Sequence, residues 1–373
     1  MTTARFIYDS PLKNIDLYYA TRFLAHDPVA FFEFKGKKYL VLDALEIDRA
    51  KKQSIADKVL LASDYDKDFE IRKGNVIAIM DVIFKKLGIK NLEVPYNFPL
   101  AVANAFKTKK YKMTIGPSPF YPDRVQKKPL EKKAILEAQK KVFKLMALSE
   151  NVIRQSKVKN GGLYFKGKTL TSELLKEILQ IEAIQLGLEM KNAIIVACGK
   201  HAIDPHDEGS GPIKQGQAII VDIFPMSSKT LFYGDATRTF CKGTAPIALK
   251  RMYAVVKYAQ EMAIGMIRAG INGRSIHEKI VECFDLKGYK TGEMDGRQQG
   301  FIHSTGHGIG LELHEYPPSI GTKDCILKSG FTTSVEPGLY YKKIGGVRIE
   351  DLVYVTKTGC EVLGYYPKHL EIP

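Results

Sequence analysis

Residues 217–240 read QAIIVDIFPMSSKTLFYGDATRTF, two strand-like segments that each carry one aspartate among apolar residues. An aspartate in such surroundings is costly to bury unless it is paired or bound to a metal. If residues 228–229 form a two-residue turn, antiparallel pairing places Asp222 and Asp235 directly opposite each other on one face. Two carboxylates placed directly opposite each other repel, and a divalent cation bound between them removes the repulsion. In a simpler alternative, one Asp caps a turn and the other pairs with Arg238.

A second group of residues with the character of metal ligands follows this hairpin. Residues 303–314, HSTGHGIGLELH, hold three of the eight histidines together with three glycines. Histidine is the commonest nitrogen ligand of metals, and glycine lets the backbone approach a ligand closely. Glu336 and Glu350 then occur within apolar, strand-like runs, the same anomaly as Asp222. Four carboxylates and one imidazole are enough to hold two metal ions about 3.5–4 Å apart.

The length of the chain favours two domains, because 373 residues exceed what one hydrophobic core usually supports. The first hundred residues have an α/β pattern, with a hairpin over 31–43 and helices over 44–55 and 76–87. Residues 94–126 carry five prolines and are the expected linker. We therefore predict an N-terminal domain over residues 1–125 and a second domain over residues 126–373.

The second domain contains two similar halves. Apolar periodicity predicts helices over 130–157 and 174–188, and again over 252–269 and 275–286. Each helix pair precedes a glycine-punctuated, strand-rich segment that holds histidine and carboxylates. We interpret this order as a diverged internal duplication of helix–helix–sheet units, which makes the protein α+β overall.

The composition is that of an ordinary globular protein, with 45% hydrophobic and 26% charged residues, and it excludes a disordered chain. No apolar run approaches the roughly 18–20 residues that cross a bilayer, and the first residues lack the apolar core of a signal peptide. We therefore expect a cytoplasmic protein with no membrane partner. The five cysteines are scattered and never form a C-x-x-C pair, which argues against a disulfide framework or a thiolate zinc site.

The net charge of +15 is concentrated in residues 101–170, which hold 17 Lys and Arg against 4 Asp and Glu. A nucleic-acid surface is one interpretation of this basic segment, which includes Lys127 and Lys128. However, the segment has few interleaved aromatic residues and contains an amphipathic helix. A solvated, lysine-rich face is the favoured interpretation, and nucleic acid is not the expected partner.

With these motifs the sequence resembles the pita-bread (M24-type) metallopeptidases, in particular the Xaa-Pro branch of aminopeptidase P and prolidase. Five positions carry the resemblance: Asp222, Asp235 in Asp-x-Thr-Arg, His307, Glu336 in Glu-Pro-Gly, and Glu350 in Arg-Ile-Glu-Asp. The resemblance covers residues 130–365 closely and the N-terminal part loosely. It implies a creatinase-like α/β domain followed by a pita-bread catalytic domain, and hydrolysis of the bond between an N-terminal residue and proline.

The resemblance also implies a role for each of the five positions. Asp222 is expected to chelate one metal ion, while Asp235 and Glu350 bridge both ions. His307 and Glu336 are expected to complete the coordination of the second ion, and Glu336 also takes a proton from water. This oxygen-rich ligand set with one histidine suits Mn²⁺, and it also admits Co²⁺, Fe²⁺ or Zn²⁺.

Further residues are implied to act on the substrate or on the ligands. They are His206 and His314 as catalytic histidines, His303 and Tyr340 at the substrate, and Arg348 as the brace of the chelating aspartate. A loop contact for His206 and a surface ion pair for Arg348 are the simpler alternatives. The implied partners are peptides with proline in the second position and a second copy of the chain, in a homodimer.

Other functions share part of this pattern. Methionyl aminopeptidase shares the GHGIG motif of residues 306–310 and the pair His314-Glu315, but Arg238 and the long N-terminal domain resemble the Xaa-Pro branch. Creatine amidinohydrolase has the two-domain fold without the intact metal set. A non-catalytic pita-bread protein that binds ribosomes or nucleic acid would agree with the basic segment, but such proteins lack ligands that this chain keeps.

Overall fold

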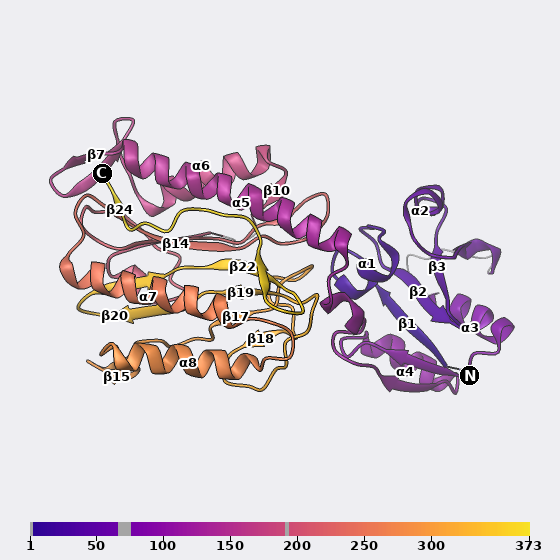
Figure 1. The fold of residues 1–373 in the computed structure, drawn as a ribbon. Helices are drawn as coiled ribbons and strands as arrows, with labels where there is room; N and C mark the ends of the chain where they lie inside the picture. Colours follow the sequence, from indigo (N-terminus) through magenta and orange to yellow (C-terminus); the bar gives the residue numbers. More distant parts are fainter. Residues whose placement is uncertain (1–2, 66–75, 191–193) are drawn as a thin grey trace. The chain divides into compact units, whose positions relative to one another are not determined.

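The computed structural model describes residues 3–65, 76–190 and 194–373. The chain divides into two compact units, Met1–Arg124 and Val125–Pro373 (Figure 1). Every helix in the described ranges is too short or too polar to span a bilayer.

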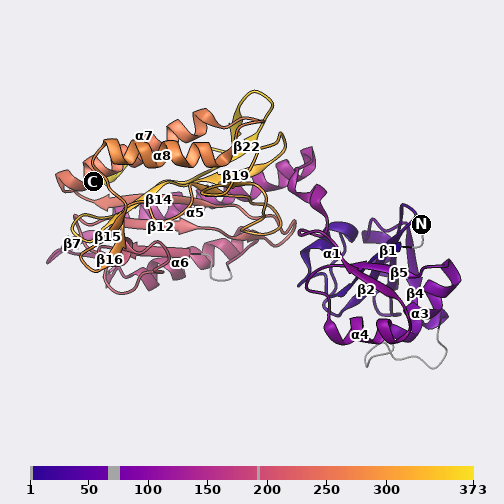
Figure 2. The same cartoon turned by 90° about the horizontal axis from the view of Figure 1, so that it is seen from below.

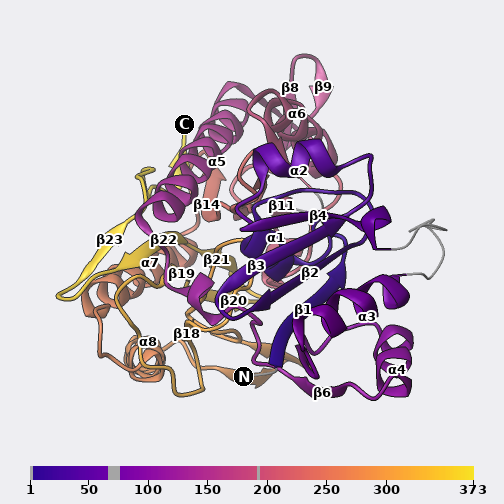
Figure 3. The same ribbon diagram turned by 90° about the vertical axis from the view of Figure 1, so that its right-hand side faces the viewer.

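The first unit is built on a six-stranded mixed sheet in the order β4-β3-β2-β1-β5-β6 (Figure 3). Phe6, Phe32, Phe84 and Phe106 meet edge to face or tilted in its core, where each is fully buried. Its elements are β1 (Thr3–Asp9), α1 (Ile15–Thr21), β2 (Val29–Phe34), β3 (Lys37–Leu42), α2 (Ile47–Gln53), β4 (Lys58–Leu61), α3 (Val76–Leu87), β5 (Asn91–Val94), α4 (Leu100–Thr108) and β6 (Lys112–Ile115), with short 3₁₀ turns η1 (Ala62–Asp64) and η3 (Pro122–Val125).

The predicted hairpin is confirmed by β2 and β3, which pair up to Phe34 and Lys37 around a two-residue turn. The predicted linker is wrong. Residues 94–126 contain α4 and β6, and β6 extends the sheet by pairing in parallel with β5. Proline is compatible with the start of a helix, and Pro99 is the residue that precedes the first turn of α4. A high proline content therefore did not mark a stretch without secondary structure.

A buried carboxylate ties α3 to the segment that follows α4. The side chain of Asp81 is 8% exposed and accepts hydrogen bonds from Lys85 Nζ (2.9 Å), Lys109 Nζ (3.0 Å) and Tyr111 Oη (2.9 Å). Burial acts to raise the pKa of Asp81, but the three donors outweigh it and hold the pKa below its usual value.

We expect Asp81→Asn to lower the free energy of unfolding by about 1–3 kcal/mol at pH 7, because the donors lose their charged acceptor. The folded-state pKa lies below the unfolded-state value of about 3.9. The carboxylate therefore stabilises the fold fully above that value, and the stabilisation is lost as the pH falls through the folded-state pKa. Thermal unfolding of both proteins between pH 7 and pH 3 measures this, with exposed Asp64→Asn as control. A difference in Tm that persists unchanged at acid pH would contradict the assignment.

The second unit places strands between two helix pairs, with α5 and α6 on one side and α7 and α8 on the other (Figures 1 and 2). The main sheets have the orders β11-β12-β14-β24 and β19-β22-β23, beside the hairpin β20-β21. The helices are α5 (Pro129–Gln155), α6 (Ser172–Gln185), α7 (Ile247–Met266) and α8 (Gly273–Leu286), with a 3₁₀ turn η4 (His201–Ile203).

The strands of this unit are short and numerous. They are β7 (Lys157–Lys159), β8 (Gly162–Phe165), β9 (Lys168–Thr169), β10 (Leu188–Glu189), β11 (Ile194–Cys198), β12 (Ile219–Ile223), β13 (Met226–Ser227), β14 (Ala236–Lys242), β15 (Gly292–Met294), β16 (Arg297–Gln299), β17 (Gly306–His307), β18 (Ser319–Ile320), β19 (Thr332–Val335), β20 (Gly338–Tyr341), β21 (Gly345–Arg348), β22 (Asp351–Val355), β23 (Cys360–Val362) and β24 (Glu371–Ile372).

The order of elements agrees with the predicted duplication. The pair α5 and α6 precedes the sheet of β11, β12 and β14, and the pair α7 and α8 precedes the sheet of β19, β22 and β23. The halves differ in how the helices are joined. A three-stranded sheet, β7-β8-β9, lies between α5 and α6, whereas residues 267–272 form a short turn between α7 and α8.

Candidate metal centre

Asp222 lies in β12, a strand whose alternate side chains face two different cores. Val221 and Ile223 pack with the residues of α5 and α6, whereas Ile220 belongs to the opposite core. Asp222 shares the face of Ile220 because side chains alternate along a strand. Its Oδ2 accepts a 2.7 Å hydrogen bond from Arg348 Nη2. Its Oδ1 is buried without a hydrogen-bond partner among the described residues.

The predicted cross-strand pairing of Asp222 with Asp235 is wrong. Asp222 pairs with Thr237 of β14, and Asp235 lies two residues before that partner, just outside the strand. The connection is longer than a two-residue turn, because Ser227 N donates to Phe232 O and four residues lie between them. Asp235 thus lies two residues away from the cross-strand partner of Asp222. Because side chains two residues apart point to the same side of a strand, both carboxylates still belong to one face.

The backbone of Asp235 is held by Gln139 of α5, a residue that the sequence analysis did not single out. Gln139 is fully buried. Asp235 N donates to Gln139 Oε1 and Gln139 Nε2 donates to Asp235 O, both at 2.8 Å. A glutamine in the apolar stripe of an amphipathic helix was the available signal, since buried amides need specific partners.

Glu350 joins the group from the position directly before β22. Its backbone N donates to Thr237 O at 3.0 Å, and its Oε2 accepts a 2.7 Å hydrogen bond from Thr237 Oγ1. Its Oε1 is buried without a hydrogen-bond partner in the described part of the chain. Thr237 is therefore the strand partner of Asp222 and the hydrogen-bond donor of Glu350, and it links these two carboxylates.

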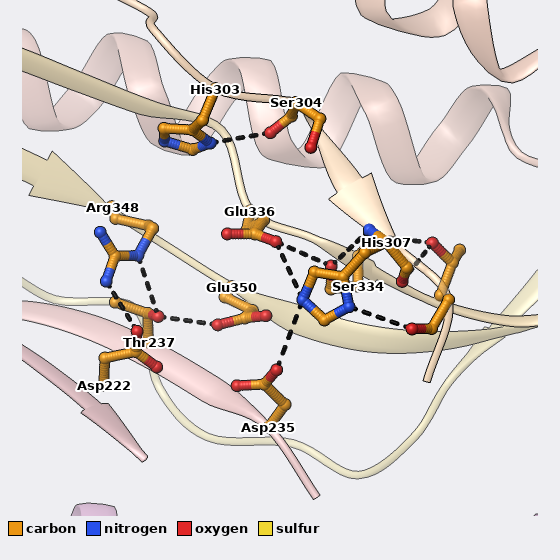
Figure 4. A network of polar contacts seen from close by, with 12 residues as sticks. Asp222, Asp235, Thr237, His303, Ser304, His307, Ser334, Glu336, Arg348 and Glu350 are labelled. Carbon is orange, nitrogen blue, oxygen red and sulfur yellow. Dashed lines mark hydrogen bonds and ion pairs between the residues drawn. The ribbon is translucent and has the colours of Figure 1, made fainter. Parts of the chain in front are cut away.

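His307 and Glu336 approach from the other side of the group (Figure 4). His307 Nε2 lies 3.3 Å from Glu336 Oε1 and 3.6 Å from Asp235 Oδ2. His307 Nδ1 donates to Gly308 O at 3.1 Å, which leaves the lone pair of Nε2 directed at the carboxylates. Ser334 Oγ donates to Glu336 Oε1 at 3.0 Å and accepts from His307 N at 3.0 Å. Ser334 thus holds the side chain of Glu336 and the backbone of His307.

The four carboxylates and His307 line a pocket of about 420 Å³. Arg348 is the one lysine or arginine among its described lining residues, against four carboxylates. Burial, followed by the neighbouring carboxylates, raises the pKa of Asp235 and of Glu350 well above the usual range. Burial also raises the pKa of Glu336 to about 7 and lowers the pKa of His307. Crowded carboxylates at a largely buried site are unfavourable unless cations compensate them.

The residues present fit divalent metal ions. Oxygen or nitrogen atoms of Asp235, His307 and Glu350 lie within 4.8 Å of one another. The unpartnered oxygens of Asp222 and Glu350 supply further donors, and buried polar atoms without a partner are rare in native structures. Carboxylates with one imidazole are also the donors that Mn²⁺ and related ions prefer.

Arg348 begins a chain of hydrogen bonds that runs along the pocket wall. Its Nη2 donates to Asp222, and its Nη1 donates to Tyr340 Oη at 2.9 Å. Tyr340 Oη lies 2.9 Å from His303 Nε2, and His303 Nδ1 donates to Ser304 O at 2.8 Å. Arg348 is 4% exposed, so the alternative of a surface ion pair does not hold. The residues expected at the substrate, His303 and Tyr340, are thereby linked to the brace of Asp222.

We expect Arg348→Ala to weaken metal binding and turnover by about 10- to 100-fold, the usual loss for an outer partner of a metal ligand. Excess Mn²⁺ should restore part of the activity, because the ligands themselves remain. Metal titration by calorimetry and kcat measured over a range of Mn²⁺ concentrations check this. Half-exposed Arg274→Ala is the control. Unchanged metal affinity in Arg348→Ala would contradict a bracing role.

The two predicted catalytic histidines also line the pocket. The ring of His314 lies 4.3 Å from that of His307, measured between centroids, and burial lowers its pKa to about 4. His314 is therefore neutral near pH 7 and retains one N–H donor. His206 is exposed on a loop whose Pro205 O accepts a 3.4 Å hydrogen bond from Arg348 Nη1.

Arg238 does not pair with either aspartate of the hairpin, as the simpler alternative required. It is fully buried and donates to Asp351 Oδ1 at 2.7 Å and to the carbonyl oxygens of Glu350 (2.6 Å) and Thr237 (2.9 Å). Gln260 Nε2 donates to the other oxygen of Asp351 at 3.1 Å. This cluster lies behind the pocket and holds the backbone of Glu350, a role that the sequence alone did not indicate.

The site is that of a metal-dependent enzyme in which carboxylates and one histidine, from strands and from positions next to strand ends, converge on a pocket. Residues 133–357 match the model of metallopeptidase family M24, and the chain belongs to this family. The predicted membership of the pita-bread metallopeptidases is confirmed, and it makes divalent metal ions the cofactor of this site.

Similar proteins are known by sequence and by structure. The chain is 33% identical over 170 residues to a Xaa-Pro dipeptidase of Pyrococcus furiosus, an alignment that covers 45% of this chain and 46% of that protein. It thus spans about half the length of the curated relatives that it matches.

The shared fold extends over almost the whole chain. The structure of an X-Pro aminopeptidase from Thermotoga maritima MSB8 superimposes with a TM-score of 0.83 at 22% identity, covering 99% of this chain and 97% of that one. A Xaa-Pro dipeptidase from Bacillus anthracis gives a TM-score of 0.83 at 25% identity, covering 99% and 95%. These matches confirm the predicted fold, a pita-bread unit together with an N-terminal α/β unit.

Proposed function

We propose that this protein hydrolyses the peptide bond between an N-terminal residue and proline, with two divalent metal ions as cofactor. The observation that carries the proposal is the convergence of four carboxylates on the Nε2 side of His307. Three of them are buried, Glu336 is 16% exposed, and two carry oxygens that are unpartnered among the described residues. The names of similar proteins, Xaa-Pro dipeptidase and X-Pro aminopeptidase, support this choice of substrate.

Five residues would hold the ions: Asp222, Asp235, His307, Glu336 and Glu350. Mn²⁺ is the proposed metal, since its preference for oxygen ligands agrees with four carboxylates and one imidazole. When bound, such ions supply Lewis acidity, which lowers the pKa of water to near neutrality and polarises a carbonyl group.

The side chains of the protein supply the remaining steps. Glu336 accepts the proton that the attacking water loses, from a position where its Oε1 lies 3.3 Å from His307 Nε2. Neutral His314 donates its N–H to the oxygen that becomes negative when the carbonyl is attacked. Arg348 keeps Asp222 oriented through the 2.7 Å hydrogen bond to Oδ2.

The pocket has features that suit a proline-containing peptide end. Apolar side chains of Ile195, Phe224 and Leu313, together with Tyr316, line it beside the polar group. They offer contact to a pyrrolidine ring, and a proline nitrogen in a peptide bond has no hydrogen that needs an acceptor. The volume of about 420 Å³ lies within the usual range for small-ligand sites.

Hydrolysis of Ala-Pro, Ala-Pro-Ala-Ala, Ala-Ala and Met-Ala-Ser in the presence of Mn²⁺ tests the proposal. We expect cleavage of a proline peptide and little cleavage of Ala-Ala, and the preference between the first two distinguishes a dipeptidase from a longer-peptide aminopeptidase. Cleavage of Met-Ala-Ser alone would instead favour a methionyl aminopeptidase. No cleavage of any peptide by protein that contains two ions per chain would overturn the proposal.

The homodimer, the cytoplasmic location and the absence of a nucleic-acid partner stay predictions from the sequence.

A further inference from the structure

A buried ion pair lies next to the pocket, between Lys127 and Glu315. Their side chains are each 1% exposed, and Lys127 Nζ donates directly to Glu315 Oε2. The expectation of a solvated lysine-rich face is therefore wrong for Lys127, which turns inward just before α5. Glu315 directly follows His314 in the chain, so the ion pair holds the residue adjacent to a pocket histidine.

The loop that joins His307 to His314 is packed on this pair. Glu315 N donates to Gly308 O at 2.8 Å, which closes the loop. A Cβ atom at Gly310 would lie 2.4 Å from Glu315 Oε2 and 2.8 Å from Lys127 Cε, so the backbone of the loop rests against both charged groups. Lys127 is itself anchored, because its backbone N donates to Gly330 O at 2.7 Å.

The energetics of buried ion pairs indicate a role beyond stability. Taking two charges out of water costs about as much as their attraction returns, and apolar residues of similar volume often replace such pairs without loss of stability. Breaking only one partner is strongly unfavourable, since it leaves a buried charge uncompensated. The carboxylate of Glu315 therefore has one strongly preferred position, beside Lys127, and this fixes the backbone on the C-terminal side of His314.

We propose that Lys127 and Glu315 are positioning residues, which hold the ring of His314 at the pocket through the loop of residues 308–315. This inference rests on the proposed function, because it assumes that the N–H of His314 acts on the substrate. It assigns to the pair no contact with metal, water or peptide.

The decisive experiment is the double variant Lys127→Met/Glu315→Leu, which removes both charges and keeps the volume. We expect metal content and Tm close to those of the wild type, KM for Ala-Pro within a few-fold, and kcat lowered by about 10- to 100-fold. A pair that only stabilises the fold would leave kcat of this variant unchanged once Tm is retained, and that result would overturn the inference.

A second comparison asks whether the effect passes through His314. His314→Ala is expected to lower kcat by about 10²–10³-fold with metal content unchanged. Adding the double change to His314→Ala should then have no further effect on kcat. An additional loss equal to that in the wild-type background would overturn the inference, because the pair would act through another residue.

Two further variants complete the test. If the double variant does not fold, Gly310→Ala displaces the carboxylate while leaving both charges in place, and a wild-type kcat for it would overturn the inference. Lys279→Met/Glu282→Leu removes an ion pair of the same type that is more than half exposed, and should leave kcat unchanged. The proposed function fails separately, if His314→Ala itself has the kcat of the wild type.

Discussion

Asp235→Asn is expected to abolish both metal binding and peptide hydrolysis. The exchange removes one negative charge and one donor oxygen from the group that Asp235 forms with His307 and Glu350. It leaves the fold intact, because Gln139 binds only the backbone of residue 235. The loss of metal affinity should exceed the 10- to 100-fold that is typical of outer partners such as Arg348.

Metal content after dialysis, measured by mass spectrometry, and kcat for Ala-Pro with added Mn²⁺ check this prediction. Asp324→Asn is the matched control, since the side chain of Asp324 is 70% exposed and lies outside the pocket. If Asp235→Asn retained two ions per chain and turned over substrate, Asp235 would not be a bridging ligand. Loss of metal by His314→Ala but not by Asp235→Asn would reverse the assigned roles.

Removal of the metal ions should have the second large effect, complete loss of activity with a lower Tm. Without the ions, Asp222, Asp235, Glu336 and Glu350 are left in one pocket with Arg348 as the compensating charge among the described lining residues. Ions that bind only the folded state stabilise it by about 2.7 kcal/mol per site at a concentration one hundred times Kd. Mn²⁺ should therefore restore both the activity and the Tm.

Thermal unfolding and Ala-Pro hydrolysis before and after exhaustive chelation, followed by titration with Mn²⁺, measure these effects. Asp235→Asn provides an internal control, because a variant that binds no ions should show no change of Tm on chelation. Full activity of the wild type after complete removal of metal would refute the assignment of a metal centre.

The residue types of the site could be recognised from the sequence because each one is anomalous where it stands. Asp222 and Glu350 are charged residues in apolar, strand-like runs of the sequence, and His307 lies among glycines. Such residues are expensive to bury without a purpose, so composition and local pattern already mark them. The helices could be predicted for a related reason, since apolar residues recur with the helical period in α5, α6, α7 and α8.

The local sequence pattern gave wrong predictions where contacts between distant segments decide the strand register or the secondary structure. The register of β12 and β14 depends on the length of their connection, and this shifted the partner of Asp222 from Asp235 to Thr237. The stretch predicted as a linker became α4 and β6, because β6 finds a partner in β5. Neither result follows from the residues of the segment itself.

The kinds of side chain at the site could be read from the sequence, whereas the partners of each side chain depend on the folded chain. The candidate ligands were marked by carboxylates in apolar surroundings and by a histidine among glycines, features that each residue shares with its neighbours in the chain. Whether Lys127 is a solvated charge or half of a buried ion pair depends on Glu315, 188 positions away. Gln139 and Arg238 likewise gain their roles only when the chain brings backbone groups of Asp235 and Glu350 to them. The free energy of a buried polar group is set by the partners that surround it in space, and these partners are fixed only when the chain has folded.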